Sequence, residues 1–472
     1  MTLRVLPAAV ALVLGSAATA AETTYIPDSA VKLAADVRER ALKDTTAYDF
    51  VADLTTQIGP RLAGSANDRR AVDWTVARFK ALGFDKVWTE PVTYPRWVRR
   101  SEHGAIVAPY AQPLSLLALG NSPATPKGGV RAEVVAFKDF TALQAADAAR
   151  VRGKIVYVGY HMKPFKDGHD YGPATAGRTA GPAFAAKLGA VAFVLRSAGS
   201  DSDRLPHTGV TSFAPGAKQI PAAAVSNADA DLLERELAGG KPVTLALDLD
   251  CGIDGQYTGA NVIAQLDGSG KPDEIVEIGG HLDSWDPGTG AIDDGAGVAT
   301  AVGAARVIAG LPQRPKRSIR VVAFANEEAG MFGGKAYSTA HKAEVAKHVL
   351  ASEADFGSGP IWRLSTQVKP EALGAIDQMM QALAPLGVER GASHAHGGDF
   401  GSFGEEGEAL VDLTEDGTHY FDWHHTANDT LDKIDPKDLA HNVAVYAVFA
   451  YLAAQADGDF GSAPGAFPAQ KE

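Results

Sequence analysis

The chain has 472 residues, a formal net charge of −13 and one cysteine, Cys251. Because no basic run of useful length appears, nucleic acid is excluded as a partner, and one cysteine excludes an intrachain disulfide. The chain is longer than one ordinary hydrophobic core requires, so we expect two lobes or one lobe with a large insertion.

The N-terminus predicts an export signal. Residues 1–20 combine Arg4, an apolar run over residues 5–14 and a small-residue end at Ala18-Thr19-Ala20. These features are typical of a cleaved signal peptide, so we expect export to the periplasm or the extracellular space. No later segment reaches the roughly 18 unbroken apolar residues that a membrane span needs.

Residues 21–129 predict the first part of a larger lobe. Apolar residues recur at helical spacing over residues 28–57 and again over residues 71–82, where Gly83 is a natural stop. The stretch from 120 to 129 is rich in Gly, Pro and Ser, which predicts a linker.

Residues 130–251 predict a separate α/β unit. Short apolar segments at 154–158 and 190–195 are typical of strands, and the Ala-rich segment at 181–188 is typical of a helix. The spacing of His, Asp and Glu that is typical of a metal site is not found in this part of the sequence.

Strand ends and loops after residue 252 carry acidic and imidazole side chains. Apolar segments at 274–278 and 318–324 predict strands that end beside such residues, and ligands in α/β sheets gather at the carboxyl ends of strands. Each residue alone has an ordinary explanation as a cap or loop residue. Their recurrence without cysteine predicts a hydrolytic metal site rather than a structural zinc site. The residues are His281, Asp293, Glu327, Glu328, Asp355, His424 and His425.

The chain resembles the family of co-catalytic di-zinc exopeptidases, which includes secreted aminopeptidases and carboxypeptidase Q, also called plasma glutamate carboxypeptidase. The resemblance extends over essentially the whole mature chain and implies a three-layer α/β/α lobe with a mixed sheet. Residues 130–251 also resemble a protease-associated domain, an α/β module that the family inserts into this lobe. The shared segments are Ile58–Ser65, Gly280–Asp286, Gly290–Gly295, Asn326–Gly330, Glu353–Gly357 and His424–Thr430.

The resemblance also implies the metal ligands. His281, Asp293 and Asp355 would hold one ion, while Asp293, Glu328 and His425 would hold the other. Asp293 would therefore bridge two zinc ions, and manganese or cobalt could replace zinc in such a site.

Three further residues receive roles from the resemblance. Glu327, beside a ligand, would be the general base. Asp283 would orient the His281 ring from behind, as acids behind ligand imidazoles do. Asp429 would act in the same way near His425, or else cap a turn.

The residue His424 stands where secreted aminopeptidases commonly have a tyrosine. As a catalytic residue it would donate a hydrogen bond to the developing oxyanion; the alternative is a structural histidine. The sequence alone leaves open whether His424 or His425 is the metal ligand. The pattern His-Thr-x-x-Asp-Thr, which ends at Asp429 and Thr430, favours His425.

The segment around Asp399 is polar and glycine-rich. Family members carry a Gly-Ser/Thr-Asp element here that lines the substrate cleft, so the resemblance implies that Asp399 is a substrate-binding or supporting residue. Gly398 stands where the hydroxyl residue usually lies. His394 and His396 are expected to be solvent-loop residues.

The predicted activity is that of an exported metallo-exopeptidase. It would hydrolyse dipeptides or N-terminal residues of short peptides by a metal-bridged hydroxide, with Glu327 as base. The inserted domain would be a lid that limits substrate length, or an appendage that stabilises the chain or forms a homodimer. The expected organisation is a signal peptide at 1–20, a peptidase lobe at 21–129 and 252–457, an insertion at 130–251 and a disordered tail at 458–472.

Two other functions share this scaffold. A glutaminyl cyclase transfers an amide with a single zinc ion, and a catalytically inactive binding protein would be expected to lose ligands or the base. The presence of Glu327 and of all five ligand positions disfavours both.

Overall fold

The computed structural model describes residues 23–391 and 394–467, so the predicted signal peptide lies outside the described residues. The helices are α1 Asp28–Ala41, α2 Thr46–Gln57, α3 Ala66–Ala81, α4 Phe140–Gln144, α5 Ala148–Val151, α6 Tyr171–Lys187, α7 Asn227–Ala238, α8 Ala296–Ala309, α9 Phe332–His341, α10 Leu373–Leu383, α11 Gly401–Gly404, α12 Tyr420–Trp423 and α13 Pro436–Gln455. The strands are β1 Lys86–Ala108, β2 Gln112–Leu114, β3 Leu116–Ala118, β4 Val130–Phe137, β5 Ile155–Val158, β6 Ala192–Arg196, β7 Ala222–Val225, β8 Thr244–Leu266, β9 Lys271–His281, β10 Arg317–Phe324, β11 His348–Glu353, β12 Arg363–Gln367, β13 Glu389–Arg390 and β14 Leu410–Thr414.

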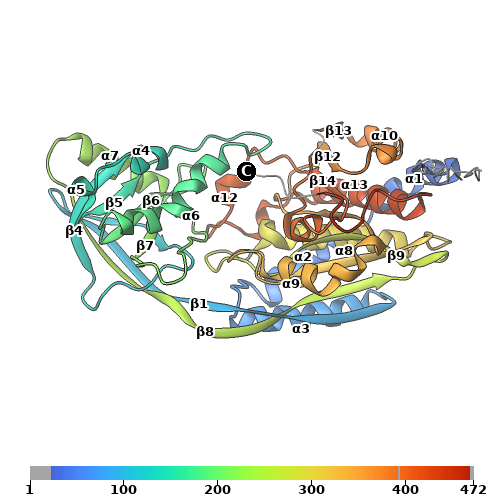
Figure 1. Cartoon of the computed structure of the whole chain (residues 1–472), viewed down its shortest axis with the longest axis horizontal. Coiled ribbons are helices and arrows are strands. Elements are labelled where there is room, and N and C mark those ends of the chain that lie inside the picture. The colour runs from blue at the N-terminus through green and yellow to red at the C-terminus, as the bar shows by residue number, and fades with distance from the viewer. Residues whose placement is uncertain (1–22, 392–393, 468–472) are drawn as a thin grey trace, which may run out of the picture.

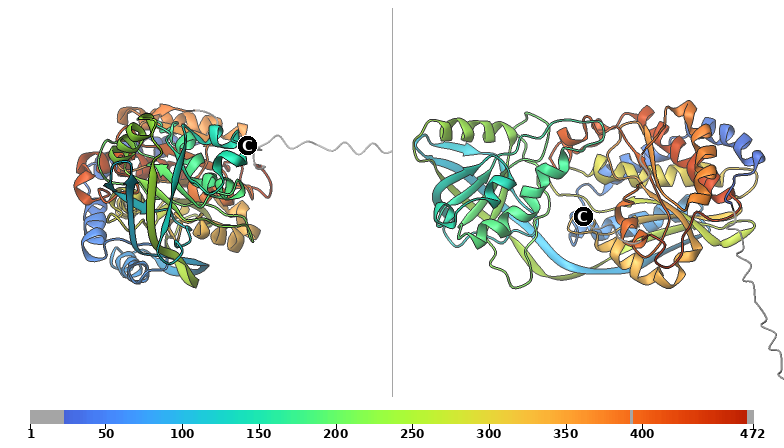
Figure 2. Two further views of the ribbon diagram at one scale, coloured as in Figure 1. Left: turned by 90° about the vertical axis from the view of Figure 1, so that its left-hand side faces the viewer. Right: turned by 45° about the horizontal axis from the view of Figure 1, so that its top comes forward.

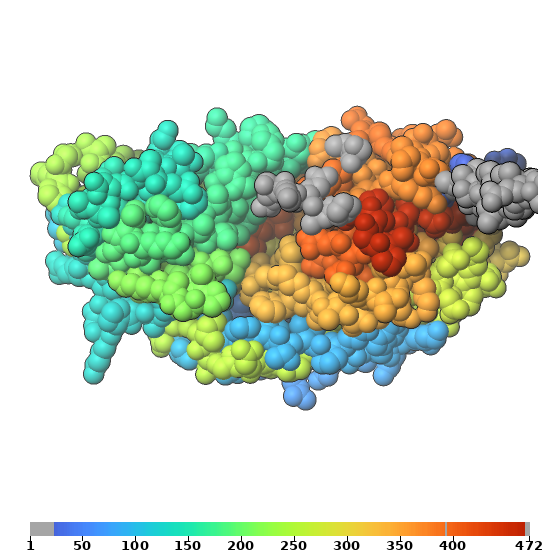
Figure 3. All heavy atoms as spheres, viewed as in Figure 1, coloured from blue at the N-terminus to red at the C-terminus, as the bar shows by residue number. Residues whose placement is uncertain are grey.

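Two lobes share the long antiparallel ribbon of β1 and β8. This ribbon runs along one side of the molecule and passes from one lobe into the other (Figure 1; Figure 2, right). In the larger lobe the strand order is β13-β12-β14-β11-β9-β10-β8, and in the smaller lobe it continues as β4-β5-β6-β7-β3. In the space-filling view the smaller lobe, coloured teal to green, lies against the orange and red part of the larger lobe (Figure 3).

The larger lobe has helices on both faces of its sheet. Strand β9 lies at the centre and pairs in parallel with β10 and β11, whereas β8 and β10 are antiparallel. One core cluster packs α1, α2, α3, α8 and α13 against the sheet, and a second cluster packs α9 and α11. Strand β10 is buried along its whole length, as expected for a strand covered on both faces. The predicted mixed α/β fold with a mixed sheet is confirmed.

The smaller lobe begins earlier than the predicted boundary at residue 130. Strand β3 pairs with β7, so residues 116–118 already belong to its sheet. The predicted linker at 120–129 lies within this lobe, where the Ser122 hydroxyl accepts the Ala222 N–H at 2.9 Å. Its Gly/Pro/Ser composition reflects turns between strands rather than a free connection. Cys251 is a buried free thiol on β8.

The C-terminal tail is ordered as far as the structure describes it, which corrects the predicted disorder over 458–467. Phe460 is fully buried, and its carbonyl accepts the Lys369 N–H at 2.9 Å. The Ser462 hydroxyl accepts the Ala409 N–H at 2.9 Å. One aromatic anchor within a Gly/Pro/Ala-rich segment is enough to hold it against the core. Among the described helices, none combines the length and apolarity that crossing a bilayer requires.

Candidate metal centre

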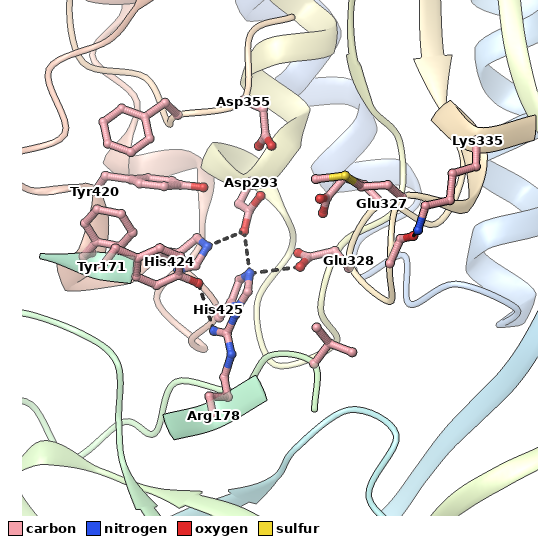
Figure 4. A pocket seen from close by; sticks show the side chains of 15 residues that line it. Tyr171, Arg178, Asp293, Glu327, Glu328, Lys335, Asp355, Tyr420, His424 and His425 are labelled. Carbon is pink, nitrogen blue, oxygen red and sulfur yellow. Dashed lines mark hydrogen bonds and ion pairs between the residues drawn. The ribbon is translucent and has the colours of Figure 1, made fainter. Parts of the chain in front are cut away.

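The predicted ligands meet at one edge of the sheet. Phe324 of β10 lies beside His281 of β9, and Glu353 of β11 lies beside Gly279, so the loops after these parallel strands emerge together. These loops carry Glu327, Glu328 and Asp355. The turn before α8 adds Asp293, and the loop after α12 adds His424 and His425 (Figure 4).

Asp293 lies between two groups of side chains. Its Oδ1 atom is 3.1 Å from His281 Nε2, which is in turn 3.4 Å from Asp355 Oδ1. Its Oδ2 atom is 3.2 Å from His425 Nε2, which is 2.9 Å from Glu328 Oε2. The structure therefore brings together all five predicted ligands, with the two carboxylate oxygens of Asp293 facing different groups. Figure 4 shows four of the five, namely Asp293, Glu328, Asp355 and His425.

The side chains of these groups fit divalent cations. Asp293 Oδ2 and Glu328 Oε1 are buried and accept no hydrogen bond within the described residues. Burial raises the pKa of Glu328 to about 7 and also raises the pKa of Asp355. Carboxylates packed this closely without a cation would have to bind protons, whereas a divalent ion would neutralise them directly. The donor set of imidazole and carboxylate, without thiolate, suits hydrolytic zinc.

His424 and His425 both face Asp293. Their rings stack at a centroid distance of 3.5 Å, and His424 Nε2 is 3.4 Å from Asp293 Oδ2. Only His425 also contacts Glu328, which favours it as the ligand. Burial and the neighbouring His425 lower the pKa of His424 well below its usual range, so its ring is neutral. His424 lines the pocket beside the two groups.

Glu327 lines the same pocket. Its backbone N–H donates to Asp283 Oδ1 at 3.0 Å, which fixes the start of the loop that carries both glutamates. Burial raises the pKa of Glu327 well above its usual range. Its side chain lines this cavity together with Asp293, Glu328 and Asp355.

Asp283 and Asp429 both accept hydrogen bonds from backbone N–H groups, which for Asp429 is the capping role that the sequence left open. The His281 ring lies 3.0 Å from the backbone carbonyl of Asp283 and 3.7 Å from its carboxylate. The carbonyl orients the ring, and the carboxylate instead holds Glu327. Asp429 accepts the N–H groups of Ala291 and Ile292 at 2.6 and 2.7 Å, so it caps the turn that presents Asp293.

Of the two roles expected for Asp399, substrate binding or support of the site, its contacts fit the second. Asp399 is 0% exposed and does not line the pocket. Its Oδ1 atom accepts the Gly334 N–H at 3.0 Å, and its own N–H donates to Glu353. Asp399 therefore fixes the beginning of α9 to Glu353 at the end of β11.

Some residues of the site were missed, although two lie inside the quoted segments. Asp294 accepts the His281 N–H at 2.9 Å and the Gly297 N–H at 3.0 Å, which joins β9 to α8. Arg61 is fully buried and donates to the carbonyls of Leu282 and Gly290 at 2.6 and 2.8 Å. The signal for Asp294 was a charged residue next to a ligand. The signal for Arg61 was an arginine in an otherwise apolar segment.

The smaller lobe also contributes to the pocket. Tyr171 and Arg178 of α6 line it together with Val210 (Figure 4). Arg178 is 7% exposed, donates to the Tyr171 hydroxyl at 2.9 Å and has no carboxylate partner in the part of the chain that is described. Nothing in the sequence marked either residue, because both come from the inserted segment.

Comparison with known proteins gives a consistent result. The model of peptidase family M28 matches residues 261–450. Mouse carboxypeptidase Q is 34% identical over 410 residues, covering 87% of this chain and 86% of the relative; for the human protein the identity is 33%, with 86% and 85% covered.

Solved structures agree. A peptidase M28 precursor from Shewanella amazonensis has a TM-score of 0.90 and 46% identity, with 94% of this chain and 100% of the other covered. A zinc aminopeptidase from Bacillus subtilis has a TM-score of 0.61 and 20% identity, with 86% and 94% covered, which shows a shared fold. The chain belongs to peptidase family M28 and is a metallopeptidase similar to carboxypeptidase Q.

Proposed function

We propose that the chain is an exported di-zinc exopeptidase that hydrolyses dipeptides or removes N-terminal residues from short peptides. The observation that carries this proposal is Asp293, whose two oxygens face two separate ligand groups. The relatives named carboxypeptidase Q and zinc aminopeptidase support an exopeptidase. Export rests on the N-terminal sequence pattern alone, and sequencing the N-terminus of the mature protein tests it.

The residues around the centre can divide the chemistry between them. Divalent cations bound here would supply Lewis acidity to the scissile carbonyl and to the attacking water. Glu327 accepts the proton of that water and passes it to the leaving amine. His424, which is neutral, donates a hydrogen bond to the oxygen on which negative charge develops.

The smaller lobe acts in this proposal as a lid of the protease-associated type. Its helix α6 extends Arg178 into the pocket that Glu327 and His424 also line. A buried guanidinium without a carboxylate partner is costly, and a substrate carboxylate would compensate it with charge-assisted hydrogen bonds. Arg178 would then bind the free C-terminus of a dipeptide, which favours short substrates over an appendage role for this lobe.

Arg178→Met is expected to raise KM for dipeptides by about 10- to 100-fold, because hydrogen bonds to charged groups contribute about 1.5–3 kcal/mol. Dipeptide amides, which lack the carboxylate, should be hydrolysed equally by both forms. Steady-state kinetics on the two substrate classes measure this difference. The control is Arg131→Met, an exposed arginine of the same lobe. An equal rise in KM for both classes would contradict the role of Arg178.

Removal of metal tests the proposed function as a whole. The purified protein should contain zinc and release free amino acids from a panel of dipeptides. Chelation should abolish release, and added zinc should restore it. Unchanged hydrolysis in metal-free protein would refute the proposal. Cyclisation of N-terminal glutamine by a protein with a single zinc would indicate the glutaminyl cyclase alternative, and bound zinc without any turnover would indicate an inactive binding protein.

A further inference from the structure

A second group of histidine and glutamate side chains lies at the opposite end of β11 from Asp355. His341 ends α9, Glu344 lies in the 3₁₀ turn Lys342–Lys347, and His348 begins β11. Each offers a ligand atom within 4.8 Å of the others. The two rings are 5.4 Å apart, and Glu344 Oε2 is 3.9 Å from His341 Nδ1.

In each ring, one nitrogen is held by a carboxylate that is not part of this group. Glu277 Oε2 is 2.6 Å from His348 Nδ1, and Glu90 Oε1 is 3.0 Å from His341 Nε2. Ligand histidines are typically oriented in this way, because a carboxylate that binds one ring N–H leaves the other nitrogen with its lone pair free. Glu277 is fully buried, so this orientation is fixed by the core rather than by solvent.

The other nitrogen of each ring accepts or donates no hydrogen bond within the described residues. His341 Nδ1 and His348 Nε2 are both buried and form no hydrogen bond in the described part of the chain. The side chain of His348 is 1% exposed. A buried polar atom without a hydrogen bond is destabilising, so two such atoms beside one carboxylate indicate a missing binding partner.

From this geometry we propose that His341, Glu344 and His348 bind a divalent cation of the zinc type, separate from the ions at Asp293. Two imidazoles and one carboxylate are a donor set that zinc accepts. Donors around one zinc ion, each about 2.0–2.1 Å from it, stand about 3.3 Å apart. Glu344, whose side chain is 49% exposed, can move to close the remaining distance. It is otherwise held by a surface pair with Lys347 at 2.8 Å, which is a weak constraint.

A comparable cluster in the smaller lobe lacks these features. His161, Asp231 and Glu234 also lie within reach of one another. However, Asp231 pairs with Arg196 at 2.7 Å and Glu234 accepts the Tyr157 hydroxyl at 2.7 Å. No buried nitrogen is left without a partner there among the described atoms, so this cluster is explained by its own pairs.

The proposed ion has a structural role. It joins the end of α9 to the beginning of β11 and, through Glu90, to β1. Helix α9 begins directly after Met331, which lines the catalytic pocket. The ion lies at the other end of this helix and would contact no substrate.

The test compares the full-length wild type with Glu344→Gln and His341→Ala. Zinc per chain is measured in solution after gel filtration, and zinc-edge anomalous diffraction locates the ions. The wild type should retain one more zinc per chain than His341→Ala, with an anomalous peak between His341 and His348. Glu344→Gln, an exposed change that leaves the core intact, should weaken zinc binding at this site by more than about 10-fold. His103→Ala, an exposed histidine on β1, is the matched control.

The outcomes separate this site from the proposed catalytic centre. Both variants should keep dipeptide hydrolysis and the peaks beside Asp293, which also shows that they are folded. Equal zinc content in wild type and His341→Ala, with no peak between the two histidines, would overturn the proposal. A peak seen only after soaking crystals in millimolar zinc, without a difference in solution, would overturn it as well.

Discussion

Glu327→Gln is expected to lower kcat by about 10²–10⁴-fold while the zinc content stays unchanged. Glutamine keeps the shape of the side chain but cannot accept the proton of the attacking water. The backbone N–H that donates to Asp283 is unaffected, so the loop should keep its position. Turnover of a dipeptide and zinc per chain, measured on the same preparation, check both parts of this expectation.

The matched control for this change is Glu405→Gln, an exposed glutamate remote from the pocket. It should behave as wild type. Near-normal turnover in Glu327→Gln would show that another residue is the base. Loss of zinc together with activity would instead make Glu327 a ligand.

Asp293→Asn should abolish activity and remove both zinc ions. One carboxylate serves both ligand groups, so its loss takes a negative ligand from each. Since metal ions contribute several kcal/mol to stabilising the transition state, kcat/KM should fall by roughly 10³-fold or more. Elemental analysis of the variant and of wild type measures the accompanying loss of metal.

Asp355→Asn is the informative comparison, because Asp355 lies beside His281 in one of the two ligand groups. It should weaken one zinc site and leave the other occupied. If Asp293→Asn lost no more zinc than Asp355→Asn, Asp293 would belong to one site only.

The resemblance to the di-zinc exopeptidases implied the ligand set, because the shared residues lie in short contiguous segments. His281 follows an apolar strand directly, and Glu327 and Glu328 follow the next one, so the parallel pairing of β9 and β10 brings them together. The mixed sheet was likewise implied by the resemblance, because the sequence pattern does not show that β8 and β10 are antiparallel.

Side-chain direction could not be predicted from spacing. Asp283 and Asp399 are near the site as expected, but the carboxylate of Asp283 accepts a backbone N–H from Glu327, and Asp399 turns toward Gly334. Each choice depends on which backbone N–H groups are left without partners once the loops pack.

Contacts between distant segments were also beyond the sequence. Arg178 reaches the pocket because β1 and β8 continue from one lobe into the other. The sequence pattern did not indicate that these two strands would be so long. The burial of Phe460 near the C-terminus could not be predicted for the same reason. Its burial depends on a surface that exists only after the chain has folded.

Zinc-edge anomalous diffraction from crystals of the wild-type protein tests the central claim most directly. Two peaks about 3.5–4 Å apart should flank the carboxylate of Asp293, one beside His281 and Asp355 and the other beside Glu328 and His425. A single peak there, or none in catalytically active crystals, would contradict the account.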